Sequence, residues 1–275
     1  MAVPARRPVL AVVSYLNTRP LVAGLAARCD LVPAVPSRCW ELVAAGVADL
    51  GVIPAIGLGD DPELVAVPGV GIAAEGPVES VVLVRRVPLA SVRSVALDAS
   101  SRASAALLRI LCARAWGIAP RFVPAAPDWA SMLAAHDAAL LIGDPAFALS
   151  DDERFRARTD LEIVDLGAAW SAWTGLPFVF AVWAGRAERV TPELVAELEA
   201  ARDRGLAALP EIARAAARNT AEEEKNLRYL RDVIRYRLGP REYAGLARYL
   251  DLAAELGLLA GGRRALAGPG AAGGR

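Results

Sequence analysis

Short apolar runs alternate with stretches of helical spacing along the first half of the chain. Almost continuously apolar runs occupy residues 9–13 (VLAVV), 31–35 and 50–53. Such runs are typical of strands buried on both faces of a parallel sheet. Helical spacing of apolar residues follows the first two runs, and the same alternation recurs over residues 92–142 without any repeat of the sequence. The pattern predicts an α/β fold with helices packed against its sheets.

Two β-rich segments, residues 78–86 and 178–183, separate these repeated units. We expect the chain to cross between two lobes along the first segment and to return along the second. The expected division is residues 1–86 with 184–260 as lobe I, 87–183 as lobe II, and a low-complexity tail over 261–275 that is predicted to be disordered. A ligand would then lie in the cleft between the lobes. A single doubly wound sheet is the structural alternative.

Polar turns follow several of the predicted strands, where ligands bind in open α/β sheets. The candidate ligand-binding residues in these turns are Ser14, Asn17, Arg19, Ser37, Ser80, Ser100, Ser101, Ser104, Gly143 and Asp144. The serine-rich turn over residues 98–104 opens a helix, whose free N–H groups favour an anion. Ordinary helix capping is the alternative for several positions, with Ser37 and Asp144 as N-caps.

Composition and charge limit the partners. The 31 basic and 31 acidic residues cancel, so no overall field attracts nucleic acid or an anionic membrane. No apolar run is long enough to span a membrane, and the N-terminus lacks the features of a secretion signal. Three scattered cysteines, Cys29, Cys39 and Cys112, have no spacing typical of a zinc site and fit a reducing cytoplasm. We therefore expect a cytoplasmic protein that binds a small molecule.

Several catalytic signatures are absent from the sequence. It contains no GxSxG, P-loop or GxGxxG motif, so hydrolase, kinase and dehydrogenase activities have no support. The one histidine, His136, stands at the end of a predicted surface helix, which favours a solvated residue over a general base. Glu75, Glu79 and Asp144 are the acidic residues that could act as a base.

A set of motifs resembles one enzyme family. The motifs are SYLNTRPL (14–21), PSRCWELVAAGVADLGVIP (36–54), GPVESV (76–81), LDASSRASAALLRILC (97–112), LLIGDPA (140–146) and DLGAAWSAWTGLPFVFAVWA (165–184). In this order, from about residue 9 to residue 259, they resemble the chorismate dehydratases of the futalosine route to menaquinone. The resemblance implies a two-lobed, periplasmic-binding-protein-like fold of type II used as a cytoplasmic carbon–oxygen lyase. It implies neither a cofactor nor a metal.

The same resemblance implies roles for individual residues. Asn17 and Ser80 stand at motif positions that would be catalytic, and the serines of the 98–104 turn would bind the substrate. The sequence departs from the family's pattern at Thr18, where alanine is commoner, and at Ala103, where threonine is expected. A related family, the dihydroxynaphthoate synthases, shares the fold but resembles an enzyme with a catalytic histidine, and His136 lies outside every motif.

The implied reaction removes water from chorismate to give 3-[(1-carboxyvinyl)oxy]benzoate. It needs donors for the ring carboxylate, a base near C3 and help for the departing hydroxyl. We favour the substrate's own enolpyruvyl carboxylate as the base, with a buried Glu75, Glu79 or Asp144 as the alternative. A solute-binding or sensing protein for a small carboxylate is the alternative function, because the fold alone does not separate the two. The sequence makes no prediction about oligomeric state.

Overall fold

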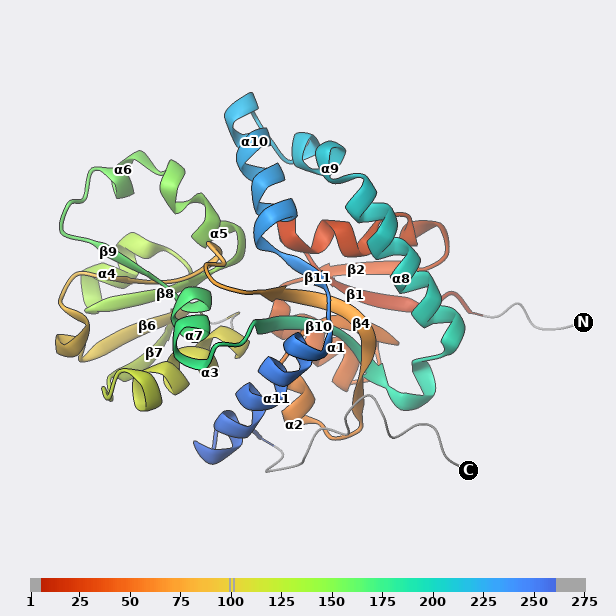
Figure 1. The fold of residues 1–275 in the computed structure, drawn as a ribbon, viewed down its shortest axis with the longest axis horizontal. Coiled ribbons are helices and arrows are strands. Elements are labelled where there is room, and N and C mark those ends of the chain that lie inside the picture. Colours follow the sequence, from red (N-terminus) through yellow and green to blue (C-terminus); the bar gives the residue numbers. More distant parts are fainter. Residues whose placement is uncertain (1–5, 99, 101, 261–275) are drawn as a thin grey trace, which may run out of the picture.

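A computed structural model describes residues 6–98, 100 and 102–260 of the chain. The chain forms two α/β lobes that lie side by side (Figure 1). Each lobe contains one mixed sheet with helices packed against it, as the sequence predicts. The tail over residues 261–275 and Ser101 lie outside the described residues.

The sheet of lobe I has six strands in the spatial order β11-β4-β10-β3-β1-β2. The bounds of these strands are β1 (Val9–Val13), β2 (Asp30–Ala34), β3 (Leu50–Pro54), β4 (Leu64–Ala74), β10 (Phe178–Arg186) and β11 (Arg235–Arg237). Strand β1 runs parallel to β2 and β3, whereas β10 runs antiparallel to both β3 and β4. The carboxyl ends of β1 and β3 therefore meet at one edge of the sheet, next to lobe II.

The sheet of lobe II has five strands in the order β7-β6-β8-β5-β9. Their bounds are β5 (Val81–Arg85), β6 (Ser94–Asp98), β7 (Arg121–Ala125), β8 (Ala138–Ile142) and β9 (Glu162–Asp165). Strand β6 is parallel to β7 and β8, and β5 is antiparallel to β8 and β9.

The helices divide between the lobes in the same way. Lobe I carries α1 (Pro36–Ala44), α2 (Gly57–Asp60), α8 (Pro192–Ala207), α9 (Leu209–Ala215), α10 (Thr220–Arg228) and α11 (Pro240–Glu255). Lobe II carries α3 (Arg102–Ile110), α4 (Trp129–Ala135), α5 (Gly143–Phe147), α6 (Glu153–Arg156) and α7 (Leu166–Thr174). Two C-terminal helices of lobe I contact lobe II. Helix α11 packs against α3, and α10 contacts α5 (Figure 1).

The sheet assignments correct the expected lobe boundaries. Strand β5 belongs to the sheet of lobe II, although residues 81–85 were assigned to lobe I, and β10 belongs to the sheet of lobe I, although most of it was assigned to lobe II. The chain thus crosses before each of these strands and not after it. An apolar run shows that a strand is buried, but it does not show which sheet the strand joins.

Among the described residues, no helix is both long enough and apolar enough to cross a membrane.

Candidate active site between the lobes

A cavity lies where the two lobes meet, with about 560 Å³ of empty space including the part open to solvent. Its lining residues come from both lobes and from the segment that joins them: Val13, Tyr15, Asn17, Thr18, Pro36, Pro54, Ile72, Val78, Ser80, Val81, Arg102, Ala103, Ser104, Ile142, Gly143, Phe180 and Ala181. Most of these side chains are apolar, and the few polar groups stand among them. This is the usual composition of a site for a small organic molecule.

Asn17 lies on one wall of the cavity, in the 3₁₀ helix η1 (Leu16–Val22) that follows β1. Its side-chain Nδ2 donates a hydrogen bond to the Tyr229 hydroxyl oxygen, at 3.1 Å. The Thr18 hydroxyl lies 3.5 Å from Asn17 Oδ1 and donates to it. These two contacts fix the orientation of the amide, so that Nδ2 has a second hydrogen left for a ligand.

Ser80 lies in the segment that joins β4 to β5, and only 2% of it is exposed. The Asp165 carboxylate holds this segment, because it accepts hydrogen bonds from the backbone N–H groups of Val78 (3.0 Å) and Glu79 (2.7 Å). Glu79 has a φ of 64°, a conformation that is unfavourable for a residue with a side chain. Asp165 compensates for this strained turn, which places Ser80 at the cavity.

Tyr229 connects these two residues, and the sequence did not single it out. Its hydroxyl donates to Ser80 Oγ at 2.8 Å and accepts from Asn17. The side chain is 2% exposed, and burial raises the pKa of the Tyr229 hydroxyl well above its ordinary value, so the group keeps its proton. Its ring packs on Phe147 of lobe II with 4.3 Å between centroids.

Two further candidates line the cavity with Asn17 and Ser80. Ser104 is buried in α3, and Gly143 stands at the start of α5 with a φ of 61°. The Gly143 N–H donates to the Ser80 carbonyl oxygen at 2.8 Å, which joins lobe II to the connecting segment. The structure therefore brings together Asn17, Ser80, Ser104 and Gly143 of the predicted set.

The other described candidates do not line the cavity. Ser14 is exposed, and its hydroxyl donates to the Ala34 carbonyl at 3.4 Å. Ser37 lies inside the first turn of α1 and is not its N-cap, because the helix begins one residue earlier, at Pro36. Ser100 donates its hydroxyl to Asp98 Oδ1 at 2.7 Å. Arg19 is exposed on η1.

The structure also corrects the expected role of Asp144 as an N-cap. Helix α5 begins at Gly143, and its N-cap, Ile142, has no side-chain capping hydrogen bond. Asp144 instead accepts from the backbone N–H of Leu16 in lobe I at 3.0 Å. Burial raises the pKa of the Asp144 carboxyl, and the Leu16 hydrogen bond opposes this rise. Its role is thus a contact between the lobes beside the cavity.

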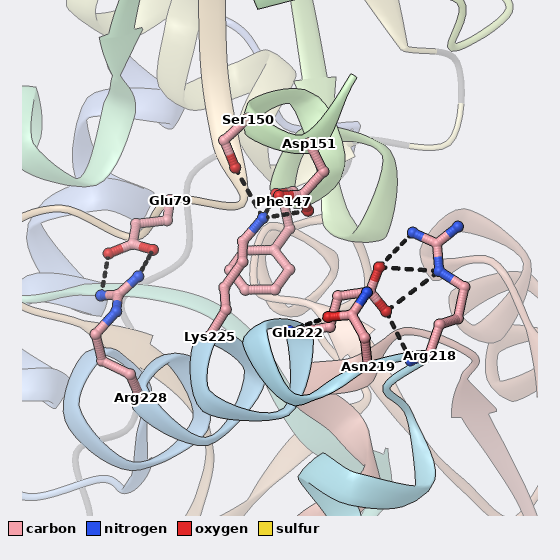
Figure 2. A network of polar contacts seen from close by, with 9 residues as sticks. All are labelled: Glu79, Phe147, Ser150, Asp151, Arg218, Asn219, Glu222, Lys225 and Arg228. Atoms are coloured by element: carbon pink, nitrogen blue, oxygen red, sulfur yellow. Dashed lines mark hydrogen bonds and ion pairs between the residues drawn. The ribbon is translucent and has the colours of Figure 1, made fainter. Parts of the chain in front are cut away.

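The two glutamates that could act as a base are also paired. Glu79 binds Arg228 through both carboxylate oxygens, at 2.6 and 2.5 Å (Figure 2). Glu75 binds Arg235 at 2.5 Å and Arg241 at 2.6 Å. Neither side chain lines the cavity. His136, half-buried after α4, does not line it either.

Helix α10 joins lobe I to lobe II next to this site. Lys225 extends from α10 toward α5, and its Nζ donates to the Phe147 carbonyl (2.8 Å), the Ser150 hydroxyl (2.8 Å) and the Asp151 carboxylate (2.6 Å) (Figure 2). The same ammonium group lies 4.4 Å from the centre of the Phe147 ring, in the range of a cation–π contact. The two lobes therefore touch in the described conformation.

Within the described part of the chain, no three His, Cys, Asp or Glu side chains are grouped as the ligands of a metal ion would be.

The two mixed sheets, the paired crossing segments and the cavity between the lobes define a periplasmic-binding-protein-like α/β protein. Its fold is similar to protein AF1704 from Archaeoglobus fulgidus, with a TM-score of 0.69 at 16% identity, over 91% of this chain and 98% of that one. It is also similar to the alkanesulfonate-binding protein SsuA from Xanthomonas axonopodis pv. citri, with a TM-score of 0.63 at 16% identity, over 97% of each chain.

Sequence comparison gives a narrower assignment. Residues 8–255 match the family described as menaquinone biosynthesis. The chain is also 34% identical over 262 residues to the chorismate dehydratase of Thermus thermophilus, which covers 85% of this chain and 95% of the relative. The protein belongs to this menaquinone biosynthesis family.

Proposed function

We propose that the protein is a chorismate dehydratase, a hydro-lyase that converts chorismate to 3-[(1-carboxyvinyl)oxy]benzoate and water for menaquinone biosynthesis. The curated relative of 34% identity carries that name. The structural observation that supports the proposal most is the meeting of Asn17 and Ser80, from motifs of the implied family, on one buried hydroxyl at the cavity. We further propose that both are catalytic.

The chemistry of chorismate fits such a cavity. Removal of the C3 proton leaves negative charge that spreads onto the ring carboxylate, and the C4 hydroxyl then leaves, so that a proton and a hydroxide are lost as water. Hydrogen-bond donors fixed around the developing charge lower the barrier, because they need no reorganisation during the reaction. The apolar walls exclude water and hold the ring in one pose.

For the base we propose the substrate's own enolpyruvyl carboxylate, held over C3 by Asn17 and Ser80. Each of the protein's three acidic candidates is engaged elsewhere: Glu75 and Glu79 by arginines, and Asp144 by the Leu16 N–H. None of these three side chains lines the cavity, so none is placed to take a proton from a substrate bound there. A carboxylate of the bound substrate needs no such side chain.

This assignment predicts that the amide variants Glu75→Gln, Glu79→Gln and Asp144→Asn keep turnover within about fivefold of the wild type. The two glutamates form ion pairs with arginines, whose loss has a small effect, and an asparagine at position 144 keeps an oxygen that can accept from the Leu16 N–H. Steady-state rates with chorismate test the prediction. If one of the three lost turnover while chorismate binding stayed intact, that residue would be the base and substrate assistance would be wrong.

Arg102 is a second proposed contact for the dianionic substrate. It lines the cavity from the first turn of α3, its Nη2 pairs with Asp60 at 2.5 Å, and its guanidinium lies over Trp40 at 4.1 Å. Its other terminal nitrogen, Nη1, is buried and has no hydrogen-bond partner among the described residues. A buried N–H group of a cation that lacks a partner is well suited to a carboxylate.

Replacement of this residue, Arg102→Lys, is expected to raise KM for chorismate about tenfold with a smaller change in kcat, because a lysine cannot hold Asp60 and a ligand with two separate nitrogens. The matched control is Arg109→Lys on the same helix, whose guanidinium lies over Phe122 and does not line the cavity. Equal KM values for the two variants would show that Arg102 does not contact the substrate.

Two features support a cytoplasmic site of action without nucleic acid or membrane partners. Cys29, Cys39 and Cys112 are all buried free thiols, which are typical of a reducing compartment. The balanced charge gives no general attraction to anionic polymers or membrane surfaces. The expected partner is the small-molecule substrate.

The test of the proposed function is to incubate the purified protein with chorismate and separate the products by chromatography with mass detection. A product lighter by one water with the spectrum of a 3-substituted benzoate is expected. Chorismate that binds but is recovered unchanged would instead indicate a solute-binding or sensing protein. No binding at all would contradict both functions.

A further inference from the structure

Tyr229 is the point where three parts of the molecule that are distant in sequence meet. It lies 212 residues from Asn17 and 149 residues from Ser80 along the chain, and its hydroxyl contacts both side chains. Building on the proposed function, we propose that Tyr229 is a positioning residue: its hydroxyl orients the Asn17 amide and the Ser80 hydroxyl so that both donate hydrogen bonds to the carboxylate groups of the substrate.

The direction of the hydrogen bonds leads to this assignment. Asn17 donates to the Tyr229 oxygen, so the Tyr229 proton is directed to the other neighbour, Ser80 Oγ. The Ser80 hydroxyl then accepts from Tyr229 and cannot donate back to it. No acceptor for the Ser80 proton exists among the described residues, and Ser80 lines the cavity. Its proton is therefore available to an anionic ligand, as is the second Nδ2 hydrogen of Asn17.

Contacts with both lobes surround Tyr229. The residue begins the π-helical turn η7 (Tyr229–Val233), which directly continues α10. One turn earlier on α10, the Phe147 carbonyl of lobe II accepts a hydrogen bond from Lys225 (Figure 2). The Phe147 ring also packs on the Tyr229 ring. The position of the hydroxyl thus depends on the contact between the lobes. Tyr229 connects the contact between the lobes to the orientation of the two donors.

The hydrogen bond itself can be tested without substrate. The chain has three asparagines, Asn17, Asn219 and Asn226, and no glutamine, so a ¹⁵N-resolved spectrum of the uniformly labelled protein contains only three side-chain amide pairs. The variant Tyr229→Phe removes the hydroxyl and keeps the ring. We expect the Asn17 pair to move and the other two pairs to stay, with Asn17→Asp providing the assignment. An unchanged Asn17 pair would overturn the proposal.

The control is Tyr236→Phe. Tyr236 on β11 is also a buried tyrosine, 3% exposed, but its hydroxyl has no hydrogen-bond partner among the described residues. This variant removes the same group from a similar environment without touching Asn17 or Ser80. It is expected to leave all three amide pairs and the rate of chorismate turnover unchanged.

The role in catalysis is tested by a double-mutant cycle on turnover. Tyr229→Phe is expected to lower kcat at least about tenfold with KM within about threefold, because a misplaced group costs rate more than binding. In the Ser80→Ala background the same change is expected to lower kcat by a smaller factor than in the wild type, because only the contact with Asn17 remains to be lost and coupled residues are not additive. Effects that multiply fully would show that Tyr229 does not act through Ser80. A wild-type enzyme without turnover would contradict the proposed function, and the amide spectrum would still decide the hydrogen-bond assignment.

Discussion

The variant Ser80→Ala is expected to lower kcat for chorismate by a factor of about 100 to 1,000 while the protein stays folded. Removal of one preorganised hydrogen-bond donor from a site of developing negative charge has an effect of this size. Ser80 is 2% exposed and receives the Tyr229 hydrogen bond, so its own proton is directed away from Tyr229 before the substrate arrives. Single-turnover rates by chromatography, together with calorimetric titration of chorismate, give the rate and the affinity separately.

Asn17→Ala is expected to show a loss of similar size, because Asn17 stands on the other side of the same hydroxyl. Ser131→Ala is the matched control: Ser131 is exposed on α4, and its hydroxyl binds only Asp128 among the described residues. Near-normal rates in both Ser80→Ala and Asn17→Ala would rule out the proposed catalytic pair. A lower melting temperature in parallel with the lower rate would indicate a structural role instead.

Much of the architecture could be predicted because it depends on local pattern. Apolar runs of about five residues mark strands such as β1 and β8, and all five residues of β8 are buried. The membership of β5 and β10 could not be predicted in the same way. Both are apolar segments at the crossing between the lobes. Strand β5 pairs with β8 and β9, and β10 pairs with β3 and β4. In each case the partners are distant in sequence.

The candidate site shows the same limit. Asn17, Ser80 and Gly143 could be found because each stands at the end or start of a predicted strand or helix, and polar turns at strand ends are where ligands bind in open α/β sheets. Tyr229 carried no such signal. It lies in a helical stretch, where the pattern predicts that a tyrosine packs in the core, and Tyr229 is buried. Only the three-dimensional contact with Ser80 distinguishes it from Tyr236.

Two serines were predicted to bind the ligand but do not line the cavity. Ser14 and Ser37 follow or precede predicted elements just as Ser80 does, yet one contacts the Ala34 carbonyl and the other lies in the first turn of α1. A hydroxyl at a turn can form a hydrogen bond with a neighbouring backbone group or face a ligand. The sequence pattern does not distinguish these two cases. The turn at Glu79, held by Asp165, is what directs Ser80 inward.

Gly143→Ala is expected to raise KM for chorismate at least about tenfold and to lower kcat as well. Gly143 has a φ of 61°, and a residue with a Cβ pays about 1–2 kcal/mol in this conformation. In addition, a Cβ at this position would overlap the ring of Tyr15, which lines the cavity from lobe I. The added methyl group would therefore push the lobes apart where they meet, beside the Asp144 to Leu16 hydrogen bond.

The control separates the steric effect from the backbone strain. Gly117 has a φ of 64°, and a Cβ there would meet nothing within 4 Å, so Gly117→Ala carries the strain without the overlap. Gly143→Ala should lose at least as much stability as Gly117→Ala in urea unfolding, but only Gly143→Ala should lose affinity for chorismate. If the two variants had equal KM values, Tyr15 and Gly143 would not need to touch for catalysis. The described contact between the lobes would then not be the conformation that binds the substrate.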